Sequence, residues 1–550
     1  MQTPVVKSTS VNLTLTDKVY KPLTINLPFQ SLLIDLGLSY DSSVAPDIRM
    51  CRVINAGKSG PKDGAEVSAN ISRESGSDTA VRIMLQDGER LEEGEMYKLT
   101  ITYHAKPLSE NLPDVITRSC YIAVNYQLDS ENLSIAALTD ARKMVVCISD
   151  IHMGQDDYYA EIKQNRKPLI DFLDKLNASP NVSEMVIAGD LIDEWIIPAS
   201  KPAEGDDFEN CNCFSEKVKR NNEGVFDALN KICANDNIIS TYVPGNHDLL
   251  MDEKQISAVL PGINQARDTK DNSTILGLGA YSPKDFPNAV IEHGHRYNFF
   301  CAPCLTSQTD PNEKSILPPG YFLTRIATEA FCYPALIHKH KLPKTKMQYG
   351  SEDIFMRSQY SAMCLSNLKM LPVRHTSSEK FIKADIDGLT GEYSIEDVMP
   401  HLEKDKLVSK LYKKISNKSN WIERQKANNV NVQISTNEAI VMSNSADETD
   451  SMSNIQYFSY EGSEKNIVVF GHSHVPRILT YPTTQGTTGI YANTGTWIDT
   501  NNLGATMTFV ALIANNHIDS APAFVNLYQY RPDGEIVLLD SQATYNFTDK

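Results

Sequence analysis

Five short apolar segments, each followed by a turn with Asp, Asn or His, constrain the fold of this chain more than any other feature. They are MVVCISDIH (144–152), EMVIAGD (184–190), IISTYVPGNHD (238–248), NAVIEHGH (288–295) and NIVVFGHSH (466–474). Helical stretches such as YAEIKQNRKPLIDFLDKLN (159–177) alternate with the apolar segments, and this alternation predicts an α/β fold. Because ligands bind outside the carboxyl ends of strands in open α/β sheets, we expect the polar turns to meet at one site.

The polar turns supply a mixed set of oxygen and nitrogen donors. Carboxylate and amide oxygens together with imidazoles suit Mn, Fe or Zn better than Ca or Mg, which prefer oxygen ligands alone. The candidate metal ligands are Asp150, His152, Asp190, Asn246, His293, His472 and His474. This set is too large for one tetrahedral zinc ion, which takes about four ligands. Two ions that share one carboxylate would use the whole set.

The order of the turns, D-x-H, GD, GNHD, HG and GHxH, resembles that of the calcineurin-like metallophosphoesterases. The resemblance covers about 145–300 and 465–500, with closing strands to about 545. It implies a four-layer α-β-β-α metallophosphoesterase sandwich. It also implies two divalent metal ions as cofactors, with manganese expected and iron or zinc as alternatives.

The resemblance also implies how the ligands divide between the two ions. One ion would be held by Asp150, His152 and His474. The other would be held by Asn246, His293 and His472. Asp190 would bridge them, because a carboxylate has two oxygens and can place one on each ion.

The reaction that the resemblance implies is hydrolysis of a phosphoester or pyrophosphate bond. A hydroxide that bridges the two ions would attack phosphorus in line with the leaving group. In the family, the His of the GNHD turn lies over the leaving oxygen as general acid, and the next Asp orients its ring. The matching residues here are His247 and Asp248. Histidine suits this role because its pKa allows proton transfer near neutral pH.

Four further residues near these turns have two interpretations each. Asp193 either favours the N-terminus of a following helix or reaches the metals through water, and Trp195 is expected to pack rather than to stack on substrate. His295 is expected outside the ligand shell, where it either supports the ligands or contacts a substrate phosphate. Arg296 either binds a substrate phosphate or caps a strand end. We therefore name His295 and Arg296 as candidate substrate-binding residues.

The pattern of the chain divides it into two domains. Residues 1–140 contain short alternating or β-branched runs such as YKLTITYH, which predict an all-β, immunoglobulin-like sandwich as an accessory domain. Residues 141–550 are expected to form the metallophosphoesterase domain, with a largely helical and loop insertion at about 301–460. The polar tract STNEAIVMSNSADETDSMSN near the end of this insertion is expected to be a loop or disordered.

Composition and charge exclude several functional classes. The formal net charge of −17 disfavours nucleic acid as a partner, because such binding relies on clustered Lys and Arg. No apolar run of about 18 residues predicts a transmembrane helix, and no signal peptide is recognisable, so the expected location is cytoplasmic. The sequence indicates no oligomeric state.

The substrate is the least constrained part of the prediction. The motifs GDLIDEW, HGH and NTGTW look similar to the branch that includes UDP-diacylglucosamine pyrophosphatases, although this chain adds the β domain and the insertion. Our first expectation is a phosphodiesterase or pyrophosphatase acting on a small nucleotide- or lipid-linked substrate. A phosphomonoesterase or phosphoprotein phosphatase is the alternative, followed by a nuclease. A non-catalytic, metal-containing binding module is the alternative of another class.

Overall fold

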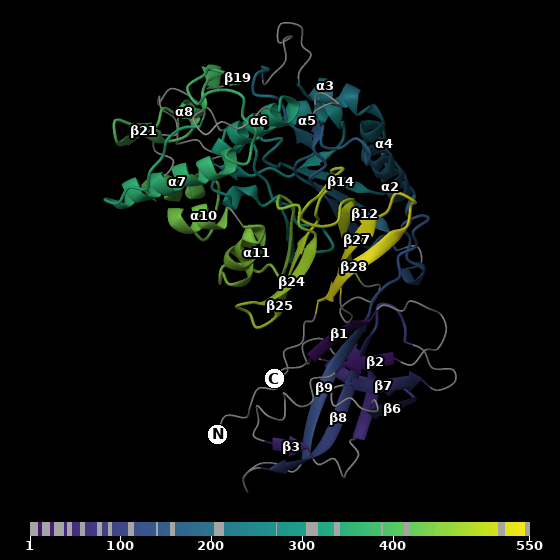
Figure 1. The fold of residues 1–550 in the computed structure, drawn as a ribbon. Helices are drawn as coiled ribbons and strands as arrows, with labels where there is room; N and C mark the ends of the chain where they lie inside the picture. Colours follow the sequence, from purple (N-terminus) through teal and green to yellow (C-terminus); the bar gives the residue numbers. More distant parts are fainter. Residues whose placement is uncertain are drawn as a thin grey trace. The chain divides into compact units, whose positions relative to one another are not determined.

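The computed structural model describes most of the chain (Figure 1). The described residues are 9–13, 23–26, 38–40, 47–55, 61–73, 80–85, 91–107, 115–138, 141–154, 160–202, 214–270, 272–303, 317–334, 342–386, 389–411, 418–443, 445–514 and 523–544. The chain forms two compact units. The first contains Met1–Met144, Leu512–Asn526 and Ser541–Lys550, and the second contains Val145–Ala511 and Leu527–Asp540.

The N-terminal part of the first unit consists of β-strands. The larger sheet has the order β1-β9-β8-β4-β5, with β3 paired to β8, and the smaller sheet has the order β2-β7-β6. The strands are Thr9–Leu13 (β1), Leu23–Asn26 (β2), Leu38–Tyr40 (β3), Asp47–Asn55 (β4), Pro61–Glu66 (β5), Ala69–Arg73 (β6), Ala80–Leu85 (β7), Met96–Pro107 (β8) and Val115–Val124 (β9). The immunoglobulin-like arrangement and the boundary at residue 140 stay predictions.

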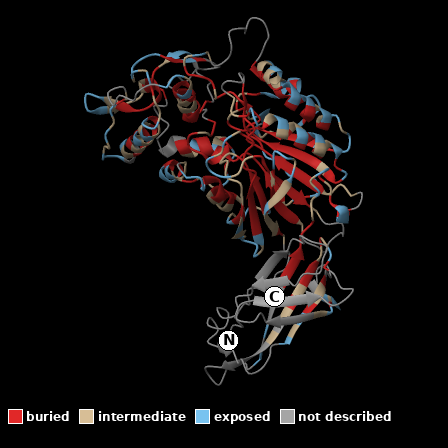
Figure 2. Ribbon diagram, turned by 45° about the vertical axis from the view of Figure 1, so that its right-hand side comes forward, coloured by how far each residue is buried: buried red, intermediate tan, exposed pale blue. Residues whose placement is uncertain are grey.

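A seven-stranded sheet carries the first three polar turns. Its order is β15-β14-β12-β10-β26-β27-β28. The strands are Met144–Ile148 (β10), Val182–Ala188 (β12), Ile239–Val243 (β14), Asn264–Gln265 (β15), Thr508–Ile513 (β26), Phe524–Tyr530 (β27) and Ile536–Ala543 (β28). β10 and β26 are buried at every position, as expected for strands covered on both faces (Figure 2).

A four-stranded sheet carries the last two polar turns. Its order is β18-β23-β25-β24, formed by Ala289–Ile291 (β18), Ile467–Phe470 (β23), Arg477–Pro482 (β24) and Thr488–Asn493 (β25). β18 and β23 run parallel, with Ala289 beside Ile467 and Ile291 beside Val469. Parallel strands end at the same edge of a sheet, so this register brings the HGH turn next to the GHSH turn although the insertion separates them in sequence.

Helices α2, α3, α4 and α5 lie in the segments that connect strands of the seven-stranded sheet (Figure 1). They span Arg166–Ala178 (α2), Phe214–Asn221 (α3), Glu223–Cys233 (α4) and Glu253–Val259 (α5). In α2, Leu169, Phe172, Leu173 and Leu176 are buried, which is the spacing of one apolar helix face. Two-residue strands complete this part: Met153–Gly154 (β11), Ile192–Asp193 (β13), Thr269–Lys270 (β16) and Ser273–Thr274 (β17).

The N-terminus of α2 is capped by a residue from a distant loop. The side chain of Asn165, the N-cap residue, makes no cap hydrogen bond to the helix. Instead, the carboxylate of Asp499 accepts the backbone N–H groups of Lys163, Gln164 and Asn165 at 2.9–3.0 Å. These donors have no partner within a helix, and a carboxylate is also favoured there by the helix dipole. The cap therefore fixes α2 to the loop that follows the NTGTW motif.

The described residues of the insertion, 301–460, form helices and short strands (Figure 1). Its helices are Pro319–Cys332 (α6), Glu352–Leu368 (α7), Ile395–Val398 (α8), Lys418–Ala427 (α9), Thr436–Met442 (α10), Glu448–Ser453 (α11) and Asn454–Phe458 (η6). Its strands are Ile382–Ile386 (β19), Leu389–Tyr393 (β20), His401–Glu403 (β21) and Lys406–Val408 (β22). Buried side chains of these elements share one hydrophobic core with Trp195, Leu249 and Phe470.

The polar tract near the end of the insertion is helical, so the expectation of a loop was wrong. Ser435 and Glu438 form a capping box at the start of α10, in which each side chain accepts the other residue's backbone N–H. This S-x-x-E signal was present in the sequence. Ala439 and Ile440 are then buried in the core of the insertion, which gives a polar segment enough apolar contact to fold.

One buried carboxylate holds both ends of the insertion. Glu292 Oε1 accepts the hydroxyl groups of Tyr297, just before the insertion, and Tyr457, near its end, at 2.7 and 2.6 Å. Glu292 Oε2 lies 2.7 Å from Arg296 Nε. Because a buried carboxyl group needs hydrogen-bond partners, these contacts fix the insertion to Glu292, the residue that precedes His293.

The predicted mixed α/β content is confirmed, and strands and helices alternate along the second unit. The four-layer arrangement stays a prediction. Among the described residues, no helix combines the length and the apolar character needed to cross a membrane.

Replacing Asp499 by Ala should destabilise the fold by about 1–2 kcal/mol, because the N–H groups at the start of α2 lose their acceptor. Urea unfolding measures this free energy. Asp174→Ala is the matched control, since Asp174 lies on α2 and pairs with Lys231 while its side chain is 48% exposed. Its effect should stay within about 0.5 kcal/mol. Equal effects of the two substitutions would contradict the capping role.

Glu448 should make stability depend on pH. Burial raises the pKa of this carboxyl to about 7, against hydrogen bonds from Asn298 and Ser443 that lower it. Between about pH 4.5 and 7 the folded state therefore holds a proton that the unfolded state has lost, so stability falls as the pH rises through this window. The loss amounts to roughly 3 kcal/mol above pH 7.

Glu448→Gln removes this titration while keeping an acceptor for Asn298 and gaining a donor toward Ser443. Urea unfolding at pH 8 should show the variant to be more stable than the wild type. Most of the gain should vanish at pH 5. A gain that is the same at both pH values would show that the carboxyl is not the cause.

Candidate metal centre

The five polar turns meet at one place, and backbone hydrogen bonds hold them side by side. The N–H of Asp150 donates to Gly189 O at 3.1 Å, which joins the first turn to the second. The N–H of Gly471 donates to His293 O at 3.2 Å, which joins the fifth turn to the fourth. The N–H of His247 donates to Asp190 Oδ1 at 2.8 Å, which joins the third turn to the second. The structure thus places all the candidate ligands in one cluster.

Much of this cluster has an unusual backbone conformation. The left-handed residues with positive φ include Asp150, His152, Asp190, His472 and His474, with φ between 50° and 67°. This conformation costs an L-residue roughly 1–2 kcal/mol, although Asp, Asn and His adopt it more readily than most. Such strain persists only where the surrounding structure imposes it, and it is typical of functional sites.

The first group of donors is Asp150, His152 and His474. His474 Nε2 lies 3.1 Å from Asp150 Oδ1 and 3.1 Å from His152 Nε2. Asp150 also accepts the backbone N–H of His472 at 3.1–3.2 Å, which orients its carboxylate. Two imidazole nitrogens and a carboxylate oxygen that face one another are the donor set of a transition-metal ion.

The second group is Asp190, His293 and His472. His293 Nε2 lies 3.0 Å from Asp190 Oδ2 and 3.0 Å from the side-chain oxygen of Asn246. The rings of His293 and His472 are 5.3 Å apart. Asn246 therefore lies beside this group, as the sequence predicted for the ligands of a second ion.

Asp190 lies between the two groups. Its Oδ2 is 3.0 Å from His293 Nε2 and 3.7 Å from His152 Nε2. The resemblance implied one carboxylate oxygen on each ion, whereas in the structure Oδ2 faces both groups. The other oxygen, Oδ1, accepts the backbone N–H of His247. Asp190 is therefore the one carboxylate in this cluster positioned to belong to both groups.

The tautomers of the histidines fit a metal. His293 Nδ1 bonds to Ala188 O at 2.8 Å, and His152 Nδ1 bonds to Asp193 Oδ2 at 2.7 Å. A proton on each Nδ1 leaves the lone pair on Nε2, the atom that faces the other donors, as is usual for metal-ligating histidines. Burial lowers the pKa of His472 to about 3, which favours its neutral ring. Burial also lowers the pKa of His293 and His152, but neighbouring carboxylates outweigh it and raise that of His293 to about 9 and that of His152 well above its usual range, so an ion would displace a proton from these two rings. Neutral imidazole is the form that binds metals.

Glycines allow the turns to approach each other. A Cβ on Gly245 would lie 2.1 Å from Asp190 Oδ1, and one on Gly471 would lie 2.5 Å from Asp150 Oδ2. The NTGTW motif supports the same turns from behind, since Thr496 Oγ1 donates to Asp150 O at 2.8 Å and Asn493 Nδ2 donates to Gly471 O at 2.7 Å. The sequence showed the NTGTW motif but did not indicate that it supports the turns.

The environment of His247 differs from the prediction. Asp193 Oδ1 lies 2.9 Å from His247 Nδ1, within ion-pair distance but outside hydrogen-bond angles. Asp248, the predicted orienting residue, instead accepts the backbone N–H groups of Gly245 and Leu191 at 2.7 and 2.9 Å. Asp248 therefore shapes the turn, and Asp193 is the carboxylate against the ring. The D-x-x-D spacing of GDLID was the signal for it.

Trp195 and His152 complete this environment. The indole of Trp195 is stacked on the His247 ring, with centroids 4.5 Å apart and planes at 28°. The ring of His152 meets His247 edge-on at 4.5 Å. The His247 side chain is 15% exposed, while Asp193 is fully buried beneath it. His247 is thus held at the rim of the cluster. As the sequence predicted, Trp195 packs, but it packs on a candidate catalytic residue.

The two candidate substrate-binding residues bond to the protein itself. His295 is buried, and its Nε2 bonds to Gly277 O at 2.9 Å. Arg296 Nη1 lies 2.6 Å from Asp268 Oδ2, and Arg296 Nε lies 2.7 Å from Glu292 Oε2. These two carboxylates neutralise the guanidinium, so the interpretation of Arg296 as a phosphate contact is not supported. The sequence could not show this pairing because Asp268 and Asn428, which also accepts from Arg296, lie far away in sequence.

Comparison with protein families agrees with this geometry. Residues 143–329 match the family model described as calcineurin-like phosphoesterase. A search of curated proteins found no match. The match confirms the resemblance seen in the sequence, and the family implies metal-dependent hydrolysis of phosphoesters. His472 and His474 lie beyond the matched residues, and it is the fold that brings them into the same cluster.

Asp190→Ala should lower the metal content of the protein more than the loss of a ligand that belongs to only one of the two donor groups. The reason is that Asp190 Oδ2 faces both groups. Metal per chain is measured by inductively coupled plasma mass spectrometry after dialysis. Asp174→Ala, on the exposed face of α2, is the control and should keep the wild-type content. Wild-type metal content in Asp190→Ala would contradict the position assigned to this carboxylate.

Proposed function

Because residues 143–329 belong to the calcineurin-like phosphoesterase family, we propose that this chain hydrolyses phosphodiester or pyrophosphate bonds with two divalent metal ions. The observation that carries the proposal is the position of Asp190 between two groups of ligand donors. Among the described residues, each group of His, Cys, Asp and Glu side chains able to hold an ion includes His152 or Asp190. The proposed substrate is a small nucleotide- or lipid-linked molecule.

The residues divide as the resemblance implied. One ion would be held by Asp150, His152 and His474. The other would be held by Asn246, His293 and His472, with Asp190 shared. When bound, two such ions supply polarisation of the phosphoryl oxygens and activation of water. Manganese is the proposed metal, because the donors mix oxygen and nitrogen and include no thiolate.

His247 is proposed as the general acid. Its backbone N–H donates to Asp190 Oδ1, so His247 is held beside the proposed shared metal ligand. Asp193 Oδ1 lies 2.9 Å from Nδ1, within ion-pair distance, and Nε2 is proposed to carry the proton that passes to the leaving oxygen. Burial lowers the pKa of the His247 ring, but Asp193 and Asp190 outweigh burial and raise it. A raised pKa favours the protonated ring that a general acid needs.

The carboxylate of Asp193 contacts both the proposed acid, His247, and the proposed metal ligand His152. Asp193 Oδ2 bonds to His152 Nδ1, and Asp193 Oδ1 accepts the backbone N–H groups of Trp195 and Ile196 at 2.8 and 2.9 Å. These bonds fix the carboxylate before any ligand binds. Effective general-acid catalysis requires such fixed geometry, since the proton must be delivered within hydrogen-bond distance.

Two finer statements about the fold belong to this proposal. We propose that the seven-stranded and four-stranded sheets are the two inner layers of the four-layer α-β-β-α sandwich. Their parallel strands and the polar turns at one edge support this arrangement. We also propose that the strands of residues 1–140 form an immunoglobulin-like accessory domain.

A matched set of substrates tests the proposed reaction. The Mn²⁺-loaded protein should hydrolyse bis-p-nitrophenyl phosphate faster than p-nitrophenyl phosphate, and EDTA should abolish both activities. A panel of nucleotide-, lipid- and protein-linked phosphoesters then identifies the substrate class. Faster hydrolysis of the monoester would favour a phosphomonoesterase. No hydrolysis of either compound by fully metal-loaded protein would favour a binding module.

His247→Ala should keep its metal but lose rate. The expected loss is about 10²–10⁴-fold on a diester with an alkoxide leaving group, the usual contribution of general acid catalysis. The loss should be much smaller on p-nitrophenyl esters, because a good leaving group departs without protonation. Metal content and steady-state rates are measured on the same samples. Full activity of the variant on the poor leaving group would rule out His247 as the acid.

A further inference from the structure

Helix α6, the first helix of the insertion, is tied to the loop that follows Trp195. The guanidinium of Arg325, fully buried on α6, donates to the carbonyl oxygens of Ile197 and Pro198 at 3.4 and 2.9 Å. It also bonds to the carbonyl oxygens of Lys201 and Lys383. A buried cation with such carbonyl partners holds its position strongly, because breaking the bonds would leave the charge unpaired. Arg325 therefore fixes α6 to the loop 197–201.

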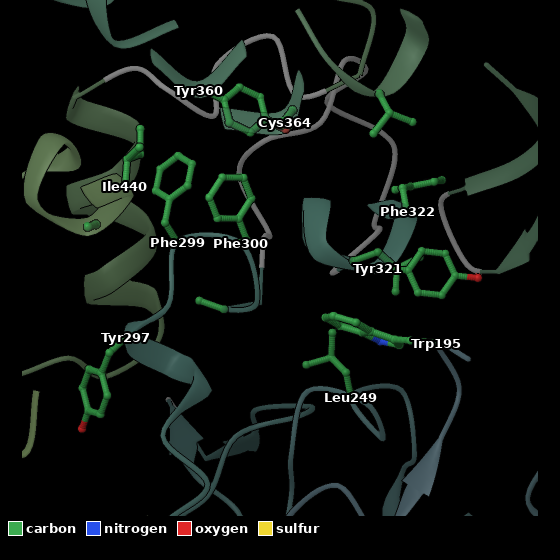
Figure 3. Packing of buried hydrophobic residues seen from close by; sticks show 14 of the residues in the cluster. Trp195, Leu249, Tyr297, Phe299, Phe300, Tyr321, Phe322, Tyr360, Cys364 and Ile440 are labelled. Carbon is green, nitrogen blue, oxygen red and sulfur yellow. The ribbon is translucent and has the colours of Figure 1, made fainter. Parts of the chain in front are cut away.

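The start of α6 packs directly on the indole of Trp195. Tyr321 meets the indole edge-on, with centroids 6.1 Å apart and planes at 88° (Figure 3). The backbone approaches even more closely at Gly320, where a Cβ would lie 3.1 Å from Trp195 Cζ3 and 2.8 Å from Phe300 O. Trp195 is only 1% exposed, so the ring has no space for another rotamer. The position of the indole is therefore set by α6.

The indole also lies against His247. Asp193 contacts one ring nitrogen of His247, and His152 meets the ring edge-on with centroids 4.5 Å apart. The stacked indole, 4.5 Å away at 28°, limits the tilt of the ring. The direction in which Nε2 points is thus fixed by Asp193, His152 and Trp195 together. A misdirected donor fails to reach the leaving oxygen even when every metal ligand is in place.

We propose that Trp195 is a positioning residue that makes the orientation of His247 depend on helix α6 of the insertion. The proposal rests on the proposed function, in which His247 protonates the leaving oxygen. The insertion then acts on one step of the reaction, the departure of a poor leaving group. It does so through packing, without contributing a metal ligand or a group that touches the phosphorus.

Two substitutions test the coupling from its two ends. Trp195→Leu removes the stacked face. Gly320→Ala places a methyl group against Trp195 Cζ3 and, more closely, against Phe300 O, so the start of α6 has to shift beside the indole. Gly350→Ala is the matched control, because the same change there meets only Ile354, at an ordinary contact distance of 3.4 Å. For each variant, kcat is measured with saturating Mn²⁺ on a nitrophenyl diester and on a diester with an alkoxide leaving group. Metal content and the urea unfolding midpoint are measured on the same samples.

Trp195→Leu and Gly320→Ala should each lower kcat on the alkoxide ester by about tenfold or more. This loss is smaller than the one expected for removal of the acid itself, because the acid remains but is misdirected. Their kcat on the nitrophenyl ester should change by less than about threefold, with metal content unchanged. Trp195→Phe keeps an aromatic face, so its kcat on the alkoxide ester should fall less than that of Trp195→Leu. Gly350→Ala should behave as wild type on both esters.

Other outcomes separate this proposal from the proposed function. Equal losses on both esters, or no loss on either, would overturn the role of Trp195 while leaving hydrolysis established. If His247→Ala itself shows no dependence on the leaving group, the general-acid assignment fails, and the role of Trp195 fails with it. If Gly320→Ala unfolds, Tyr321→Leu, which removes the edge contact of α6 with the indole, tests the same coupling.

Discussion

The carboxylate of Asp190 is the contact on which the rest of the site depends. One oxygen accepts the backbone N–H of His247, and the other faces His293 and His152. Burial raises the pKa of Asp190, but the neighbouring histidines outweigh burial and hold it well below its usual range. A second buried carboxylate, Asp150, lies in the same cluster. Two such charges in a dry interior need compensating positive charge, which the neighbouring histidines supply in part, and the facing donors around them form candidate sites for metal ions.

The folded chain has to hold this arrangement against its own backbone preferences. Left-handed residues at Asp150, Asp190 and His474 and the close approach of Gly245 to Asp190 leave the turns little freedom. The buried strands before the turns supply the opposing stability, because each is fixed by its neighbours over its whole length. Preorganised donors of this kind need not rearrange when a ligand binds, which is an advantage in catalysis.

The insertion is joined to the turns of the site by buried polar contacts. Glu292, the residue before His293, accepts hydrogen bonds from both ends of the insertion, and Arg325 joins α6 to the loop after Trp195. The core of the insertion is continuous with Trp195 and Leu249 (Figure 3). Because the indole of Trp195 is stacked on His247, this core reaches a candidate catalytic residue.

The sequence by itself determined the candidate ligands and the α/β content of the second unit, because apolar strands followed by polar turns are a local pattern. It missed the capping box at Ser435, which was also local. Only the tertiary structure decided that Asp193, not Asp248, lies against His247, and that Arg296 is neutralised by Asp268. Those outcomes depend on which distant segments pack together, and a side chain's partner across such a contact is set by packing rather than by its neighbours in the chain.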